Sequence, residues 1–177
     1  MSKTLGLAGA LAVCAVTAVA ADDRLPVTLP PEMRDAFRAE MRGHMDTLDD
    51  LLMALAAGDV DEAADIAEIR MDFGHRRWTA MAEAGRTPEE IAQAKRALRQ
   101  AGGPVGAGGM GGGGFGRYLP DDFRAMGLAM HESAQAFAMD ARAVERPVDA
   151  AGYARLIDSL QFVTSSCRSC HATWRLE

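Results

Sequence analysis

The chain has 177 residues, 49% of them hydrophobic, and a formal net charge of −6. This length and composition suffice for one domain with an apolar core. The acidic balance argues against a nucleic-acid partner, because nucleic acids select basic surfaces.

The first twenty residues predict an export signal. Lys3 precedes an apolar stretch from Leu5 to Val19, which is short for a membrane span, and Ala18-Val19-Ala20 forms a small-residue cleavage site. We expect a signal peptide over 1–20, a periplasmic mature protein over 21–177, and no membrane span after cleavage. A retained membrane anchor and a lipoprotein modified at Cys14 are the alternatives.

Two long helices are expected in the first half of the mature chain. Apolar residues recur at steps of three and four from Met33 to Leu55, after Pro30-Pro31 and before Gly58. Asp59 is a candidate N-cap for a second helix, from Val60 to Ala84. Gly74 lies inside this second helix, where a glycine costs about 1 kcal/mol relative to alanine.

The middle of the chain changes character. Thr87-Pro88 predicts the start of a short peripheral helix that ends near Gln100. The low-complexity segment Gly102 to Gly116 predicts a flexible loop. A phosphate-binding glycine loop needs a strand before it and a helix directly after it, and no strand is predicted here. A nucleotide site is therefore not favoured.

The second half predicts two further amphipathic helices. The first follows Pro120 and ends at Arg146-Pro147, and the second runs from Asp149 to Trp174. Four long helices with short connections predict an all-α, antiparallel four-helix bundle. In that arrangement the end of the last helix lies beside the first half of the first helix.

A Cys-x-x-Cys-His motif closes the last helix, at Cys167, Cys170 and His171. This spacing is the attachment motif of a c-type haem, in which two thioethers hold the porphyrin and the histidine becomes the proximal iron ligand. We therefore expect one covalent haem c (iron) per chain. A redox-active dithiol, a structural zinc site and a plain disulfide are the alternatives.

The opposite axial position of the iron would be supplied by the first helix. Its candidates are Met33, Phe37, Met41, His44 and Met45. A thioether or an imidazole would give a six-coordinate iron, whereas an apolar side chain would leave the position open. For each methionine the competing interpretation is core packing.

The motif, with Trp174 and Arg175 after it, and Met41-Arg42-Gly43-His44-Met45 in the first helix resemble the cytochrome c′ family and its low-spin, six-coordinate members. The resemblance implies that Met41 is the distal iron ligand, with His44 and Met45 as fallbacks, and that Arg175 contacts the haem edge. It also implies a homodimer through the first two long helices. Residues around 86–116 would be a helical and Gly-rich insertion in a single domain.

The function expected from this resemblance is electron transfer, not enzymatic catalysis. The protein would carry single electrons to and from redox partner proteins of the periplasm. The alternative is a five-coordinate haem protein that binds NO or CO at an open iron. A haem peroxidase would need an acid–base pair above the iron, for which His44 alone is thin support.

Overall fold

Helices make up most of the chain in the computed structural model, which describes residues 22–100 and 115–177. The predicted signal peptide, with Cys14, and nearly all of the Gly-rich segment lie outside these residues. The expectation of a mainly helical protein is confirmed. The elements are β1 (Leu25–Val27), α1 (Pro31–Ala56), α2 (Val60–Arg70), α3 (His75–Glu83), α4 (Pro88–Gln100), a 3-10 helix (Phe115–Tyr118), α5 (Asp121–Ala143), α6 (Ala150–Thr173) and β2 (Trp174–Leu176).

The helix starts use the capping chemistry that the sequence suggested. The Asp59 carboxylate accepts a hydrogen bond from the Glu62 amide at 3.0 Å, at the start of α2. Asp149 accepts one from the Gly152 amide at 2.7 Å, at the start of α6. Each bond satisfies one of the backbone donors that the first turn of a helix leaves unpaired. These caps place the starts of α2 and α6 where the sequence predicted them.

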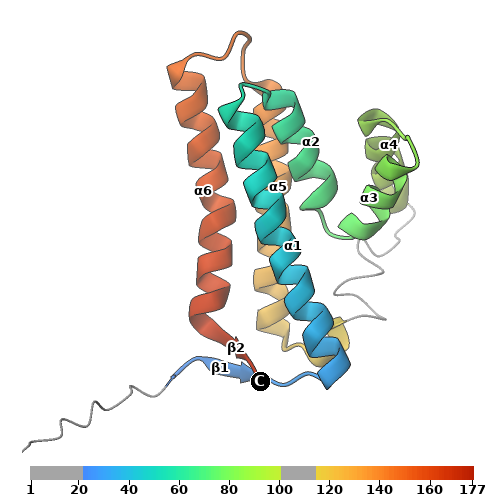
Figure 1. The fold of residues 1–177 in the computed structure, drawn as a ribbon, viewed down its shortest axis with the longest axis vertical. Helices are drawn as coiled ribbons and strands as arrows, with labels where there is room; N and C mark the ends of the chain where they lie inside the picture. The colour runs from blue at the N-terminus through green and yellow to red at the C-terminus, as the bar shows by residue number, and fades with distance from the viewer. Residues whose placement is uncertain (1–21, 101–114) are drawn as a thin grey trace, which may run out of the picture.

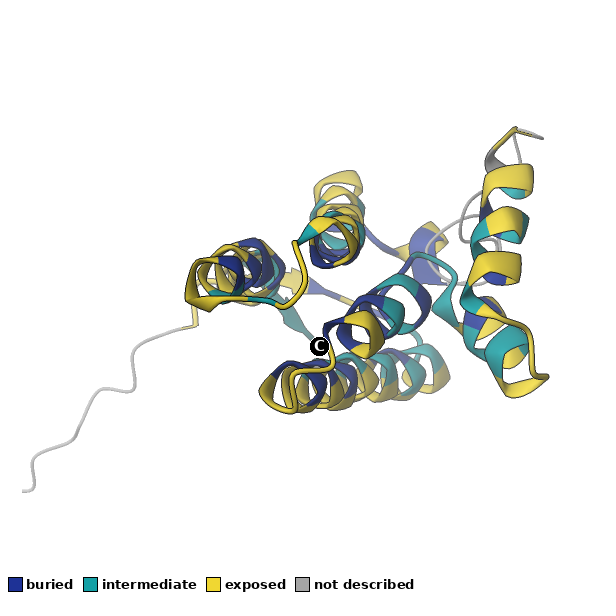
Figure 2. Cartoon of the chain, turned by 90° about the horizontal axis from the view of Figure 1, so that it is seen from above, coloured by how far each residue is buried: buried dark blue, intermediate teal, exposed yellow. Residues whose placement is uncertain are grey.

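The main core lies among α1, α2, α5 and α6, which run side by side (Figure 1). Helix α5 packs against α2 and α6, and α2 packs against α1. Seen from above, these helices have a buried side and an exposed side (Figure 2), as amphipathic patterning requires. The fully buried side chains of this core include Leu51, Ala63, Ala67, Ala134, Phe137, Leu156 and Val163.

The expectation of one long second helix was wrong. Helix α2 ends at Arg70, and α3 begins at His75 after Gly74, whose φ of 83° is left-handed. Glycine adopts this conformation without steric cost. The chain therefore turns, and α3 and α4 stand beside α2 (Figure 1). There Trp78, 1% exposed, packs in a separate cluster with Ile69 and Ile91.

A short parallel sheet, which the sequence did not predict, joins the two ends of the described chain. Strand β1 pairs with β2 so that Leu25 faces Trp174 and Val27 faces Leu176. Val27 and Leu29 are buried, at 2% and 4% exposure, in a second apolar cluster. The segment before α1 is thus anchored beside the Cys-x-x-Cys-His motif.

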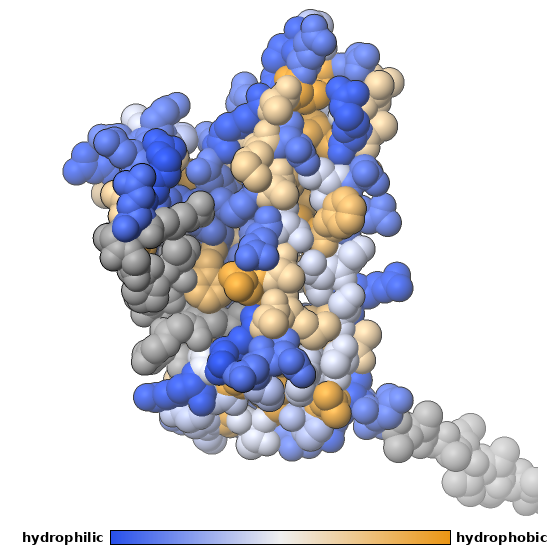
Figure 3. Space-filling model, turned by 180° about the vertical axis from the view of Figure 1, so that it is seen from behind, coloured by the Kyte–Doolittle hydropathy of each residue, from blue (hydrophilic) through white to orange (hydrophobic). Residues whose placement is uncertain are grey.

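The surface mixes polar and apolar side chains. On the face turned away from the viewer of Figure 1, hydrophobic side chains lie among hydrophilic ones (Figure 3). Large exposed apolar residues include Met139 on α5 and Phe162 on α6, at 66% and 63% exposure. In the described part of the chain, no helix combines the length and hydrophobicity needed to cross a bilayer.

Candidate functional site

The two cysteines of the motif lie in the last two turns of α6. A spacing of three residues places them on one face of the helix. Both are free thiols in the structure and both are half-buried. Burial raises the pKa of Cys167 and of Cys170, so both thiols stay protonated at neutral pH. The alternative of a disulfide is not what the structure contains.

A groove of about 400 Å³ opens beside Cys170, between α1, the end of α6 and the β1–β2 pair. Its apolar wall comes from Phe37 and Met41 on α1, Phe123 on α5 and Trp174. Trp174 and Phe123 meet edge to face, with ring centroids 5.6 Å apart. A volume of this size is in the range of small-molecule and cofactor sites.

Four arginines line the same groove, and sequence reasoning found only one of them. Arg38 and Arg42 are one turn apart on α1, Arg24 comes from the residues before β1, and Arg175 lies in β2. The Arg24 guanidinium donates to the His171 carbonyl at 3.2 Å, and the Arg175 Nε donates to the Arg24 carbonyl at 3.3 Å. The spacing of Arg38 and Arg42 around Met41 could have been read from the sequence. The arrival of Arg24 depends on the unpredicted strand pairing.

The structure separates the three distal-ligand candidates. Met41 lines the groove together with Cys170 and the exposed His171. Met45 is 64% exposed on α1. His44 lines a different groove, with Glu40 and His75. Of these three candidates, therefore, only Met41 lines the same groove as Cys170 and His171. The earlier candidates Met33 and Phe37 belong to the apolar cluster that packs beneath Cys170.

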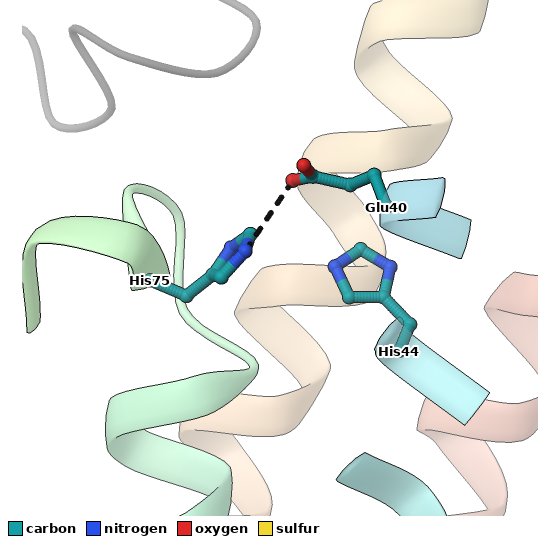
Figure 4. A group of neighbouring side chains, drawn as sticks. All are labelled: Glu40, His44 and His75. Atoms are coloured by element: carbon teal, nitrogen blue, oxygen red, sulfur yellow. Dashed lines mark ion pairs between the residues drawn. The ribbon is translucent and has the colours of Figure 1, made fainter. Parts of the chain in front are cut away.

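A second polar cluster, which the sequence did not reveal, lies on the other side of α1. Glu40 and His44 are one helical turn apart, and His75 approaches them from the start of α3 (Figure 4). Burial lowers the pKa of His44 to about 4, and also lowers the pKa values of His75 and His131. These histidines are neutral at pH 7. The spacing of Glu40 and His44 was visible in the sequence, but the approach of His75 depends on the turn at Gly74.

Comparison with known proteins gives one match. The family described as GHMP kinases C terminal matches residues 51–117. The matched segment is fewer than half of the 177 residues and includes α2, α3 and α4. No curated protein and no solved structure matches the chain.

This match contradicts the resemblance to the cytochrome c′ family, and the functions drawn from that resemblance are corrected with it. The match points to a kinase family, not to a carrier of electrons or a protein that binds NO or CO. It also contradicts the expectation of a protein that is not an enzyme, and it lends no support to haem. The physical reason for the error is plain. A Cys-x-x-Cys-His motif specifies how a haem is attached, not what a protein does, so the functional prediction rested on the resemblance alone.

Proposed function

We propose that this chain binds one haem c covalently, through thioethers to Cys167 and Cys170, with His171 as the proximal iron ligand. We also propose that α1, α2, α5 and α6 form an antiparallel four-helix bundle that supports it. The observation that carries the proposal is the groove beside Cys170, which combines an aromatic wall with four arginines. A haem complements both features: its apolar porphyrin ring suits the aromatic wall, and its carboxylate side chains suit the arginines.

The residues present fit such a group. Two free thiols on one helical face are spaced for two bonds to one edge of a ring. Phe37, Phe123 and Trp174 offer an apolar surface that excludes water from one face. The guanidinium groups of Arg24 and Arg175 can pair with carboxylates, since planar N–H donors match carboxylate geometry. When bound, a haem supplies one iron whose axial positions are filled by side chains or left open.

The side chains of the groove would then have distinct roles. The His171 imidazole would be the iron ligand that α6 supplies. The Met41 thioether, which lines the same groove from α1, would be the second protein ligand of the iron. The Arg24 contact to the His171 carbonyl fixes the end of α6, and so positions the imidazole. Arg175 contacts the edge of the ring.

We extend the proposal to location and assembly. Residues 1–20 would direct the chain to the periplasm. A second copy of the chain would pack on α1, where Met45, Leu52 and Met53 are exposed at 64%, 43% and 65%. These three residues share one helical face, because their spacing is seven and eight residues. Replacing Met53 with glutamate would turn a dimer into a monomer in analytical ultracentrifugation, whereas an unchanged sedimentation coefficient contradicts the assembly.

The haem proposal is tested by expression in a host that attaches haem to exported Cys-x-x-Cys-His chains. The wild-type band should keep haem staining and absorbance after denaturation, because thioethers survive unfolding. The Cys167→Ser/Cys170→Ser double variant should lose both. Cys14→Ser is the matched control, since this residue lies in the predicted signal peptide, and its haem content should equal that of the wild type. Equal haem retention by the double variant, or none by the wild type, rejects covalent attachment.

The family match favours a second candidate function, the phosphoryl transfer of a kinase. Binding of a nucleotide to the folded state should raise the melting temperature in the presence of Mg-ATP. Residues 51–117 exclude both cysteines of the motif, so the Cys167→Ser/Cys170→Ser variant should show the same rise. A melting temperature that does not change with Mg-ATP, together with no release of phosphate or transfer to a substrate, rejects this candidate.

A further inference from the structure

The cluster of Glu40, His44 and His75 is built from two helices, α1 and α3, and from the turn at Gly74 that brings them together. Glu40 and His44 share one face of α1, one turn apart. His75 is the first residue of α3, where the left-handed Gly74 turns the chain back toward α1. His131 of α5 lies behind them, with its ring centroid 5.6 Å from that of His44. The side chains of Glu40, His44 and His75 converge on one point (Figure 4).

The spacing of the polar atoms suits one small cation. The Glu40 Oε1 and the His75 Nε2 are 3.5 Å apart. Two ligands of one tetrahedral zinc, each about 2.1 Å from the metal, are about 3.4 Å apart. One ligand atom from each of Glu40, His44 and His75 lies within 4.8 Å of the other two.

Within the part of the chain that the structure describes, the His44 ring has an unpaired buried nitrogen. Its Nε2 is buried and has no hydrogen-bond partner among the residues that the structure describes. A buried polar atom without a partner is costly, so such an atom in a native fold calls for an explanation. The neutral ring that carries its proton on Nδ1 offers a lone pair at Nε2, and the neutral form is the one that binds metals. A groove of about 340 Å³ borders Glu40, His44 and His75, and gives an ion and a water access to them.

A neighbouring cation already positions the carboxylate. Arg76 pairs with the Glu40 Oε2 at 2.7 Å, so the Glu40 Oε1 is the oxygen turned to His75. Outer contacts of this kind commonly orient metal ligands. The His131 Nδ1 donates a hydrogen bond to the Met71 carbonyl at 2.8 Å, which fixes the His131 ring beside His44.

We propose that Glu40, His44 and His75 bind a divalent transition metal of the zinc class, with a fourth position open to water from the adjacent groove. Two imidazoles and one carboxylate are ligands that zinc accepts, and three protein ligands with a water are the pattern of an open zinc site. Calcium and magnesium prefer oxygen ligands, so two histidines argue against them. The site is distinct from the groove at Cys170. The two grooves are lined by different residues of α1.

The proposal is tested with zinc itself on the full-length chain, after treatment with a chelator and desalting. Calorimetric titration should show one zinc per chain. X-ray absorption at the zinc edge should show nitrogen and oxygen at about 2.0–2.1 Å and no sulfur at about 2.3 Å. Because X-ray absorption edges are specific to an element, the zinc spectrum reports on this site even when iron is bound elsewhere. The Cys167→Ser/Cys170→Ser variant should keep the wild-type affinity, because its thiols are not ligands.

The variants separate ligands from neighbours. Glu40→Gln, His44→Gln and His75→Gln should each weaken zinc binding more than about 10-fold, the smallest effect expected even for an outer contact. Arg76→Ala should weaken it by about 10–100-fold, because this residue positions Glu40. Met45→Ala, exposed on the same helix, is the control and should not change the affinity. His75 is half-buried at a helix start, so His75→Gln keeps the test decisive if another variant unfolds.

Three results would overturn the proposal. They are the absence of zinc binding by the wild type, wild-type affinity in folded His75→Gln, and sulfur in the coordination shell of the bound zinc.

Discussion

Met41 and Cys170 pack against the same apolar cluster, although one lies early in α1 and the other in the last turn of α6. Phe37 and Phe123 complete the contact, with ring centroids 5.8 Å apart. The end of the chain that bears the motif is therefore held against the first half of α1. Both the proposed thioether attachment and the proposed distal ligand depend on this relationship.

Replacing Met41 should change the haem spectrum of the loaded protein, whereas replacing Met45 should not. Met41 lines the groove with Cys170, and Met45 is 64% exposed. Met41→Ala removes the thioether that we place at the iron, so the absorption bands should shift to those of a five-coordinate iron. Optical spectra of Met41→Ala, Met45→Ala and His44→Gln make the comparison. A shift in Met45→Ala or His44→Gln but not in Met41→Ala contradicts the assignment.

Shortening Val27 should loosen the end of α6. Val27 is 2% exposed and its carbonyl accepts a hydrogen bond from the Glu177 amide at 3.0 Å. Val27→Ala should lower the free energy of unfolding by about 2 kcal/mol and speed hydrogen exchange at Glu177. Thr28→Ala, at the exposed position next to it, should leave both unchanged. Unaltered exchange at Glu177 in Val27→Ala would show that β1 does not anchor the end of the chain.

Lys95 should be among the most sensitive positions for stability. Its side chain is 3% exposed, and its ammonium lies 2.7 Å from the carboxylate of the equally buried Asp72. The same ammonium donates to the Glu68 carbonyl at 2.7 Å, which ties α4 to α2. Lys95→Met leaves a buried carboxylate without its cation. The free energy of unfolding, measured with urea, should therefore fall by about 3–5 kcal/mol.

The control for Lys95 is an ion pair of the same kind on the surface. Arg86 and Glu90 are exposed and 3.2 Å apart. Arg86→Ala should cost about 0.5 kcal/mol or less, since exposed pairs contribute little. Equal losses in the two variants would mean that burial of the Lys95 pair has no energetic consequence.

The histidine cluster should make the chelator-treated protein less stable in acid. Burial lowers the pKa of His44 to about 4, with smaller contributions from His131 and His75 and an opposing one from Glu40. Between pH 4 and 6.5 the unfolded histidine binds a proton and the folded one does not, so the free energy of unfolding falls as the pH falls through this window. The loss is ~3 kcal/mol at most.

Urea midpoints at several pH values measure this loss. In His44→Gln the free energy of unfolding should depend less on pH in this window, because the glutamine side chain does not titrate. Met45→Gln, a change at an exposed position on α1, is the control and should leave the slope unchanged. A wild-type slope in folded His44→Gln would assign the acid sensitivity to other groups.

Local patterns predicted most of the helices. The bounds of α1, α5 and α6 follow from apolar residues at three- and four-residue steps and from prolines and capping aspartates at their starts. The turn before α3 escaped prediction because its cause is tertiary. Trp78 packs with Ile69 of α2 only after the chain has turned at Gly74. Strand β1 has three residues, too few for any periodicity, and exists only because Trp174 to Leu176 lie beside it.

The site divides in the same way. Cys167, Cys170 and His171 lie within five consecutive residues, so their motif was visible without a structure. The four arginines of the groove come together only because Arg24 and Arg175, from opposite ends of the chain, are in contact in the fold. The cluster of Glu40, His44 and His75 likewise depends on two helices that a turn brings together. The predicted function failed for another reason, since attachment chemistry does not determine what a bound group does.

The most direct measurement is the intact mass of the mature chain under denaturing conditions, after expression in a host that attaches haem. The proposal predicts a chain heavier by one haem, with no thiol that can be alkylated at Cys167 or Cys170. A chain of unmodified mass in which both cysteines alkylate would contradict covalent attachment and remove the central claim.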